Sequence, residues 1–301
     1  TINEVMATGG QLGIATEHME EFTRVMIDLS NSCEDLNAEE AATSIAKFAN
    51  IMGTDQSKFS NIGSTIVDLG NNFATPEKPI MEMAQRLAGA GRQVGMSEAD
   101  ILGFAAALSS VGIEAQMGGS SFSKAMVKME VATVEGGQAL DDFASISGMS
   151  SEQFKAMWDA NPADAFMAFI VGLSQMDEEG ISAIATLNDI GISEIRLRDT
   201  LLRATNATEL FQSALDRSNA AWEENTALST EANKRYATTE SKLTNLKNKV
   251  LNHPITDINA KGHYHINYQV IKNGRKVTAF LFTMVLPDEE VEESDDGQKT
   301  I

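Results

Sequence analysis

A short junction motif recurs along this chain and restricts most of it to short helices. At Gly95-Met96-Ser97-Glu98 a glycine is followed by an apolar residue, a serine and a glutamate, and related runs begin at Gly13, Gly148 and Gly191. Glycine readily takes the left-handed conformation that ends a helix, the apolar residue packs back on that helix, and the serine caps the next one. The motif therefore predicts helices of roughly 12 to 18 residues that succeed one another almost without loops.

The core of these helices must be built from small and flexible side chains. Only 6% of the 301 residues are aromatic, whereas 43% are hydrophobic and 15 are Met, which fills irregular gaps between helices. Cys33 is the single cysteine, so the sequence excludes an internal disulfide and indicates a reducing compartment. The sequence opens at Thr1 without a signal peptide, and we interpret it as a fragment of a longer chain. Its most apolar run, residues 165–173, has about half the length that crosses a bilayer, so we expect no membrane segment.

Charge divides the sequence into three blocks within a total of −20. Residues 1–241 contain 15 basic and 35 acidic residues, residues 242–286 contain 7 basic residues and one acid, and residues 287–301 contain one basic residue and 7 acids. These balances predict an acidic main part, a basic C-terminal part and a short, disordered acidic tail.

Residues 1–206 are predicted to form an array of packed helices, because apolar residues recur there at helical spacing. Leu102, for example, is expected to face the core. Thr16, Asn37, Thr75 and Asn161 are expected to cap the helices that follow them. The pairs Gly118-Gly119 and Gly136-Gly137 are expected to break the chain between helices.

From residue 207 to residue 249 the sequence predicts a single long helix. No glycine or proline occurs between Ala207 and Val250, which permits a helix of about 40 residues and roughly 60 Å. Residues at alternating spacings of three and four form a heptad seam that polar side chains weaken in the middle. This seam could pair with another copy of the chain or lie on the preceding bundle. Its candidate self-association residues are Phe211, Leu215, Trp222, Tyr236, Leu243 and Leu246.

The segment after residue 250 changes to β-strand character. A short helix is expected from His253 to about Ala260, and the alternation in residues 263–285 predicts two strands around an Asn273-Gly274 turn. Lys272, Arg275 and Lys276 crowd the tip of this hairpin, where they are candidate contacts for DNA phosphates or simply a solvated tip. The turn would pair Ile266 with Leu281, Tyr268 with Ala279 and Val270 with Val277 on one apolar face.

The sequence contains no recognisable catalytic or cofactor site. None of the four histidines has a cysteine or carboxylate at metal-ligand spacing, and the shared strand face of His263 and His265 is better interpreted as a surface accident than as a metal pair. The glycine-rich run 89–95 lacks the dinucleotide-binding spacing and ends a helix. We therefore expect no enzyme activity, no cofactor and no bound metal.

Three runs within residues 1–249 carry a family resemblance. They are NAEEAATSIAKFANIMGT at 37–54, GSTIVDLGNNFATPEKPIMEMAQRLAGAGRQVGMSEADILGFAAALSSVGIEA at 63–115 and AWEENTALSTEANKRYATTESKLTNLKN at 221–248. These runs closely resemble the core region of phage tail tape measure proteins. The resemblance implies a mostly helical structural protein that lies in the lumen of a siphophage-type tail, sets tail length during tube polymerisation and is released at DNA ejection. The long ruler and apolar segments typical of the family are missing here, so the chain resembles one internal domain of such a protein.

A different resemblance begins at residue 250. Residues 250–285 read VLNHPITDINAKGHYHINYQVIKNGRKVTAFLFTMV. This run resembles the end of the second winged-helix domain of plasmid replication initiator proteins, in which a helix leads into a hairpin wing. The preceding helices of that family are missing, and any phosphate contacts of the hairpin would be independent of base sequence and sensitive to salt. We interpret the joint between the two segments as a recombination or assembly chimera.

The sequence thus predicts a mainly all-α fold, an irregular multi-helix array of about ten helices that ends in a long helix and a small C-terminal β-hairpin. The expected domains are a helical tape measure core (1–206), a long coiled-coil-like helix (207–249), a short helix with a hairpin as a partial winged helix (250–286) and the acidic tail (287–301).

The first functional hypothesis is a structural tape measure fragment that acts in tail assembly and tail-length determination. Its expected partners are phage tail tube and tail assembly proteins, with a homo-oligomer in the full-length protein. Its expected locations are the virion tail and, during assembly, the bacterial host cytoplasm. The alternative is a DNA-binding replication initiator fragment that acts through residues 250–286.

Overall fold

The computed structural model describes residues 2–33, 35–178, 181–246, 253–260, 265–273 and 276–285. Over these residues the chain forms fifteen α-helices and one two-stranded antiparallel sheet, and it separates into two compact units, Thr1–Arg235 (unit 1) and Tyr236–Ile301 (unit 2). The predicted mainly α-helical class with a C-terminal hairpin is confirmed, although the helices are more numerous than the expected ten or so. The predicted disorder of the acidic tail falls outside the described residues.

The helices are short, as the junction motif predicts. Their bounds are α1 Ile2–Gln11, α2 Met19–Ser32, α3 Ala38–Met52, α4 Phe59–Asn72, α5 Glu77–Gln93, α6 Glu98–Ser110, α7 Ser120–Glu135, α8 Gln138–Ile146, α9 Ser151–Ala160, α10 Pro162–Glu178, α11 Ala183–Asp189, α12 Ile195–Thr205, α13 Thr208–Glu224, α14 Ala227–Leu246 and α15 His253–Ala260. The strands are β1 His265–Asn273 and β2 Lys276–Val285.

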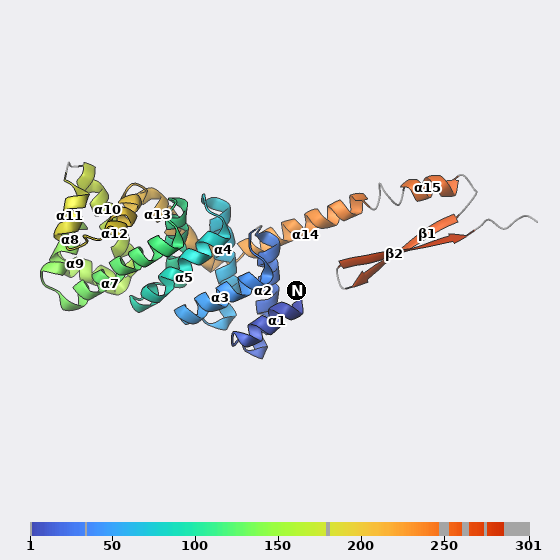
Figure 1. Cartoon of the computed structure of the whole chain (residues 1–301), viewed down its shortest axis with the longest axis horizontal. Coiled ribbons are helices and arrows are strands. Elements are labelled where there is room, and N and C mark those ends of the chain that lie inside the picture. The colour runs from blue at the N-terminus through green and yellow to red at the C-terminus, as the bar shows by residue number, and fades with distance from the viewer. Residues whose placement is uncertain are drawn as a thin grey trace, which may run out of the picture. The chain divides into compact units, whose positions relative to one another are not determined.

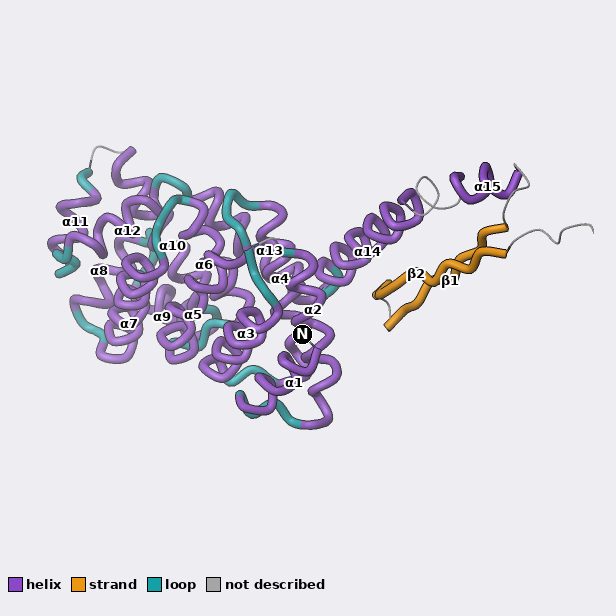
Figure 2. Tube along the Cα trace, turned by 45° about the vertical axis from the view of Figure 1, so that its right-hand side comes forward, coloured by secondary structure: helices purple, strands orange, loops and turns teal. Residues whose placement is uncertain are grey.

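The helices of unit 1 are stacked mostly in chain order (Figure 1). Helices α1 to α3 lie at one end, α4 to α6 lie in the middle, and α7 to α12 lie at the other end. Helix α13 departs from this order, because it returns to the middle and packs on α4 and α6 (Figure 2). A cluster of buried phenylalanines from α6, α7, α10 and α13 joins the middle to the far end, with ring centroids 4.6 to 6.5 Å apart. Its members are Phe104, Phe122, Phe166 and Phe211.

The glycines of the junction motif take the conformation that the motif requires. All four have φ between 70° and 85° (Gly13, Gly95, Gly148 and Gly191). The residue after each glycine donates its backbone N–H to the carbonyl five residues earlier, as Met96 does to Gly91 at 2.9 Å. This hydrogen bond closes a helix and turns the chain at once into the next element. Gly53 and Gly112 make the same turn, at junctions that the sequence motif does not include.

Four predicted helix caps are confirmed. Ser97 and Ser150 each accept a hydrogen bond from the backbone N–H three residues later, and each is completed as a capping box. Asn37 accepts from the backbone N–H groups of residues 39 and 40, and Asn161 accepts from those of residues 163 and 164. Each cap satisfies N–H groups that have no partner within the helix.

Three other predicted caps are wrong, because tertiary contacts take their place. Thr16 lies within a 3₁₀ turn, and the Gln56 side chain accepts from the backbone just before it at 2.8 Å. The Thr75 hydroxyl contacts a serine hydroxyl of α6 at 2.6 Å and leaves the start of α5 uncapped by a side chain. Ser193 does not cap α12, which begins after Glu194, and Glu194 forms an ion pair with Lys124 of α7 at 2.7 Å.

The predicted break at Gly118-Gly119 is also wrong. Residues Ala115–Gly119 form a π-helical turn that leads directly into α7. These glycines are needed for space instead: a Cβ on Gly118 would lie 1.8 Å from Ile113, and one on Gly119 would lie 2.5 Å from the Cβ of Arg86. The absence of a side chain therefore lets this turn sit directly on α5.

The predicted single helix over residues 207–249 is divided in two. Helix α13 ends at Glu224, Asn225 takes a left-handed conformation with φ of 48°, and α14 begins at Ala227. We call the Asn225-Thr226 pair the elbow. Because α13 belongs to unit 1, the domain boundary expected at residue 206 lies inside this compact unit.

In unit 2 the short helix and both strands are confirmed, but the predicted hairpin register is wrong. The strands pair Ile266 with Met284, Tyr268 with Phe282 and Val270 with Phe280, with an irregularity between Ile271 and Lys272. This arrangement sets larger apolar residues opposite one another, and the rings of Tyr268 and Phe282 lie 6.0 Å apart. Asn273 pairs with Lys276 and therefore belongs to β1 instead of the turn, and the irregularity shifts the register further. Asn259 of α15 is hydrogen-bonded to both the N–H and the carbonyl of Ile266, which ties the helix to β1.

Candidate functional site

The predicted self-association residues of α13 lie inside unit 1. Phe211 is fully buried in the phenylalanine cluster, and Leu215 is 3% exposed. Gly103 allows this close packing, since a Cβ there would lie 3.0 Å from the backbone of residues 214 and 215. Of the two alternatives for this part of the seam, the structure supports packing on the preceding bundle. Leu215 and Phe211 are therefore corrected from candidate contacts between copies to core residues.

The remaining seam residues have different surroundings. Trp222 is partly buried and packs against the core of unit 1, and Tyr236 is 36% exposed on α14. Leu243 and Leu246 lie on α14, but their side chains are outside the described part of the chain. Self-association through these residues stays a prediction.

Polar contacts fasten α13 to α4 and α6. Arg217 forms two hydrogen bonds with the Asp68 carboxylate of α4, at 2.6 and 3.1 Å. The buried Ser218 hydroxyl donates to the carbonyl of Ala99 at 2.6 Å. The strength of these hydrogen bonds depends on the angle between donor and acceptor. They therefore restrict the position and rotation of α13 more than apolar packing does.

Contacts to α4 also determine the elbow. The Asn225 side chain donates to the Ser60 hydroxyl at 3.0 Å. The Ser64 hydroxyl accepts from the backbone N–H groups of Ala227 and Leu228, at 2.8 and 3.4 Å, so a residue of α4 caps α14 from outside. The sequence does hold a signal for this elbow, because asparagine tolerates the left-handed conformation and threonine is common just before a helix. The absence of glycine and proline from residues 207–249 is therefore not sufficient to predict an unbroken helix.

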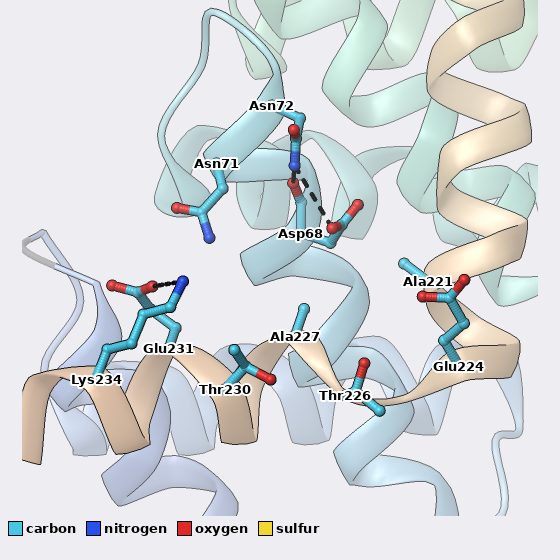
Figure 3. Close-up of a pocket in the computed structure, with 10 residues that line it drawn as sticks. All are labelled: Asp68, Asn71, Asn72, Ala221, Glu224, Thr226, Ala227, Thr230, Glu231 and Lys234. Carbon is cyan, nitrogen blue, oxygen red and sulfur yellow. Dashed lines mark hydrogen bonds and ion pairs between the residues drawn. The ribbon is translucent and has the colours of Figure 1, made fainter.

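A polar hollow of 440 Å³ lies at the elbow (Figure 3). Asp68, Asn71 and Asn72 of α4 line one side, and Thr230, Glu231 and Lys234 of α14 line the other. Asp68 is bonded to Arg217, and Glu231 forms ion pairs with Lys234 and Arg235 at 3.8 and 3.3 Å. The Asp68–Arg217 pair thus joins α4 to α13, whereas the ion pairs of Glu231 lie within α14.

Near the start of α14 a buried thiol faces a partly buried carboxylate. The Cys33 thiol donates a hydrogen bond to Glu77, and burial raises the pKa of both groups. The Arg235 charge partly offsets this effect at Glu77. A thiol with a raised pKa stays protonated near neutral pH and is a poor nucleophile, so Cys33 acts here as a hydrogen-bond donor within the packing.

The described residues contain no group of three or more His, Cys, Asp or Glu side chains that could hold a metal ion. Within the same ranges, no helix has both the length and the apolar character that a membrane span requires.

The candidate DNA contacts belong to the hairpin of unit 2. Lys272 is the second-last residue of β1 and Lys276 is the first residue of β2, on either side of residues 274–275. Their side chains, and the whole of Arg275, lie outside the described part of the chain. The pairing of Lys272 with Val277 and of Asn273 with Lys276 still brings both lysines to one end of the sheet.

Unit 1 is an all-helical scaffold, and its described hollows lie between helices and are lined by both polar and apolar atoms. Residues 1–190 match the family described as phage-related minor tail protein, and the chain therefore belongs to this family. Residues 227–284 match a second family, described as Initiator Rep protein, WH2. No curated protein and no solved structure matches the chain.

Both resemblances found in the sequence are confirmed, with different limits. The tail-protein match ends at residue 190 instead of about 249, and the initiator match begins at residue 227 instead of about 250. The second match therefore includes α14, which lies in the run 221–248 that resembles the tail protein.

Proposed function

We propose that this chain acts in phage tail assembly as part of a tape measure protein, and that it sets tail length through helix-helix contacts with other proteins. Membership of the minor tail protein family, over residues 1–190, carries the proposal. The outer helices offer apolar side chains for such contacts, including Val134 of α7 and Ile195 of α12, which are 72% and 75% exposed. The chain performs no catalysis and needs no cofactor in this role.

The partners in this proposal are tail tube and tail assembly proteins, met first in the host cytoplasm and then in the virion tail. A length ruler must be an extended rod, whereas the glycine junctions fold residues 1–206 into short packed helices. Unit 1 would therefore supply contacts for assembly, and homo-oligomers of the full-length protein would form through other segments or through the exposed part of α14.

Polymerisation of the matching tail tube protein, with and without the purified chain, tests this proposal. Cosedimentation of the chain with the tubes, together with a change in the distribution of tube lengths seen by electron microscopy, is the expected result. Tubes of unchanged length that leave the chain in the supernatant would contradict the proposal.

A second candidate function is DNA binding by the C-terminal segment. The match of residues 227–284 to the initiator family favours it, as does the balance of 7 basic residues against one acid in residues 242–286. In this role Lys272, Arg275 and Lys276 contact phosphates at the hairpin tip.

Binding of duplex DNA to the full chain and to a chain truncated at Val250, measured over a range of salt concentrations, tests the second candidate. Three phosphate contacts give a slope of log K against log salt of about −2.7, and replacing all three basic residues by alanine should remove most of it. Equal affinity of the full and truncated chains would exclude DNA binding through this segment.

A further inference from the structure

Helices α3 and α5 run parallel and are joined at intervals across a groove. The links are Glu40 to Lys78 at 3.7 Å, the Ser44 carbonyl to Gln85 at 3.4 Å and the Ile51 carbonyl to Arg92 at 2.8 Å. The stretch from residue 40 to residue 51 covers roughly 16 Å of helix. A groove of this length can hold about five residues of an extended peptide.

One end of this groove is a hollow of 610 Å³ with basic and amide side chains. Lys47 and Asn50 line it from α3, Arg86 lines it from α5, and Gln116 lines it from the π-helical turn. Ile51 adds an apolar surface that is 38% exposed. The hollow thus offers positive charge, amide donors and acceptors, and a small apolar contact.

The two cations of this hollow have no carboxylate partner among the described residues, a property that they share with the exposed Lys58 and Arg196. Lys47 and Arg86 form no ion pair with any described residue, although residues 1–241 contain 35 acids and only 15 basic residues. Lys124 and Arg217, by contrast, are held by carboxylates within 2.7 Å. Glu82 also lines the hollow but is not paired with either cation.

Neighbouring residues restrict the position of Arg86. The first carbon of its side chain packs against Gly119, where an added Cβ would lie 2.5 Å away, and its backbone carbonyl accepts from the Ser123 hydroxyl at 3.3 Å. The side-chain amides of Asn50 and Gln116 form no hydrogen bond within the described chain. An incoming backbone could therefore bond to both amides without displacing an internal partner.

The other end of the groove has the opposite character. A second hollow of 580 Å³, which shares Glu82 with the first, is lined by Glu39, Glu40 and Lys78, and Lys78 is paired with Glu40. Like charges repel, so this end disfavours an acidic ligand and the basic end favours one. The groove therefore selects the direction in which a charged segment lies.

We propose that the basic end of the α3–α5 groove binds an acidic segment of a partner protein in extended conformation. A carboxylate of the segment lies between Lys47 and Arg86, and its backbone bonds to Asn50 and Gln116. The surplus positive charge in this hollow carries the inference, which goes beyond tail assembly because it holds whether or not the chain sets tail length.

The test measures the binding of short fluorescent peptides to the full chain at low ionic strength. A peptide of alternating glutamate and alanine should bind at least about tenfold more tightly than its glutamine analogue, as expected for two charge-assisted contacts. The double variant Lys47→Glu with Arg86→Glu should remove this preference. Both side chains are exposed, so the fold should persist, and circular dichroism checks this.

Matched controls separate a site from a general effect of charge. The double variant Lys58→Glu with Arg196→Glu makes the same change in net charge at cations outside the groove, and it should leave the preference intact. Equal binding of the glutamate and glutamine peptides, or equal loss in both double variants, would overturn the proposal. Tighter binding of a single-stranded oligonucleotide of equal charge would also overturn it, by assigning the groove to nucleic acid.

Discussion

Replacing Leu102 by aspartate tests the packing of α6, the helix at the centre of unit 1. Leu102 is fully buried. Loss of the leucine side chain costs about 3 kcal/mol. Burial raises the pKa of the introduced carboxyl by about three units, which adds about 4 kcal/mol at neutral pH. The total is comparable with the whole stability of many domains, about 5 to 15 kcal/mol.

Thermal unfolding followed by circular dichroism measures this effect. We expect a fall in Tm of roughly 15 to 25 °C or complete unfolding at neutral pH. The folded-state pKa of the introduced carboxyl is raised, so its destabilising effect grows as pH rises above the ordinary aspartate pKa and shrinks as pH falls toward it. Leu102→Asn lacks the titrating group and should show the loss of packing without this added pH dependence.

Val134→Asp is the matched surface control, because Val134 is 72% exposed. This substitution should change stability by no more than about 0.5 kcal/mol. If Leu102→Asp melts within a few degrees of the unmodified chain, or follows pH as Leu102→Asn does, the assignment of this face to the core is wrong.

Three further substitutions test separate features. Gly172→Ala should destabilise the chain by at least about 2 kcal/mol in urea unfolding, because its Cβ would lie 1.8 Å from a backbone oxygen of α8. Gly89→Ala, where nothing lies within 4 Å of the added Cβ, should instead stabilise the chain by up to about 1 kcal/mol. If both substitutions stabilise the chain, or both destabilise it, the packing of α10 on α8 is contradicted. At the elbow, Asn225→Ala should lower the free energy of unfolding by about 1 to 2 kcal/mol. Asn225→Gly should lower it less, because glycine adopts the left-handed conformation readily, and equal losses would show that this conformation does not matter for stability. Burial raises the pKa of Glu77, so Glu77→Gln should stabilise the chain at neutral pH. This gain in stability should shrink as pH falls toward the ordinary glutamate pKa. A gain that grows on acidification would show that the folded state lowers this pKa instead.

Local chemistry explains which parts of the fold the sequence could predict. The junction glycines were identifiable because their left-handed conformation is a property of glycine itself, and Ser97 and Asn161 cap helices with their own side chains. Asn225 and Thr226 give only a weak local signal for the elbow, and the contacts that stabilise it come from α4, more than 150 residues earlier. The hairpin register was missed because Asn273 pairs with Lys276 and so belongs to β1 instead of the turn, and the irregularity after Ile271 adds a further shift.

The groove between α3 and α5 could not be predicted for a related reason. Lys47 and Arg86 are single cations at ordinary helical positions, and no spacing rule joins them. Only the parallel packing of the two helices brings them into one hollow.

The cap that Ser64 provides for α14 has a practical consequence for anyone dividing this polypeptide. The initiator match begins at residue 227, yet Leu228 and Ala232 are buried within unit 1. Truncation before residue 227 would remove these two buried apolar side chains from the core. It would also leave the Ser64 hydroxyl without the backbone N–H groups that it accepts from. The start of the second family match is therefore not a boundary for folding, and a separable N-terminal piece should extend through Arg235.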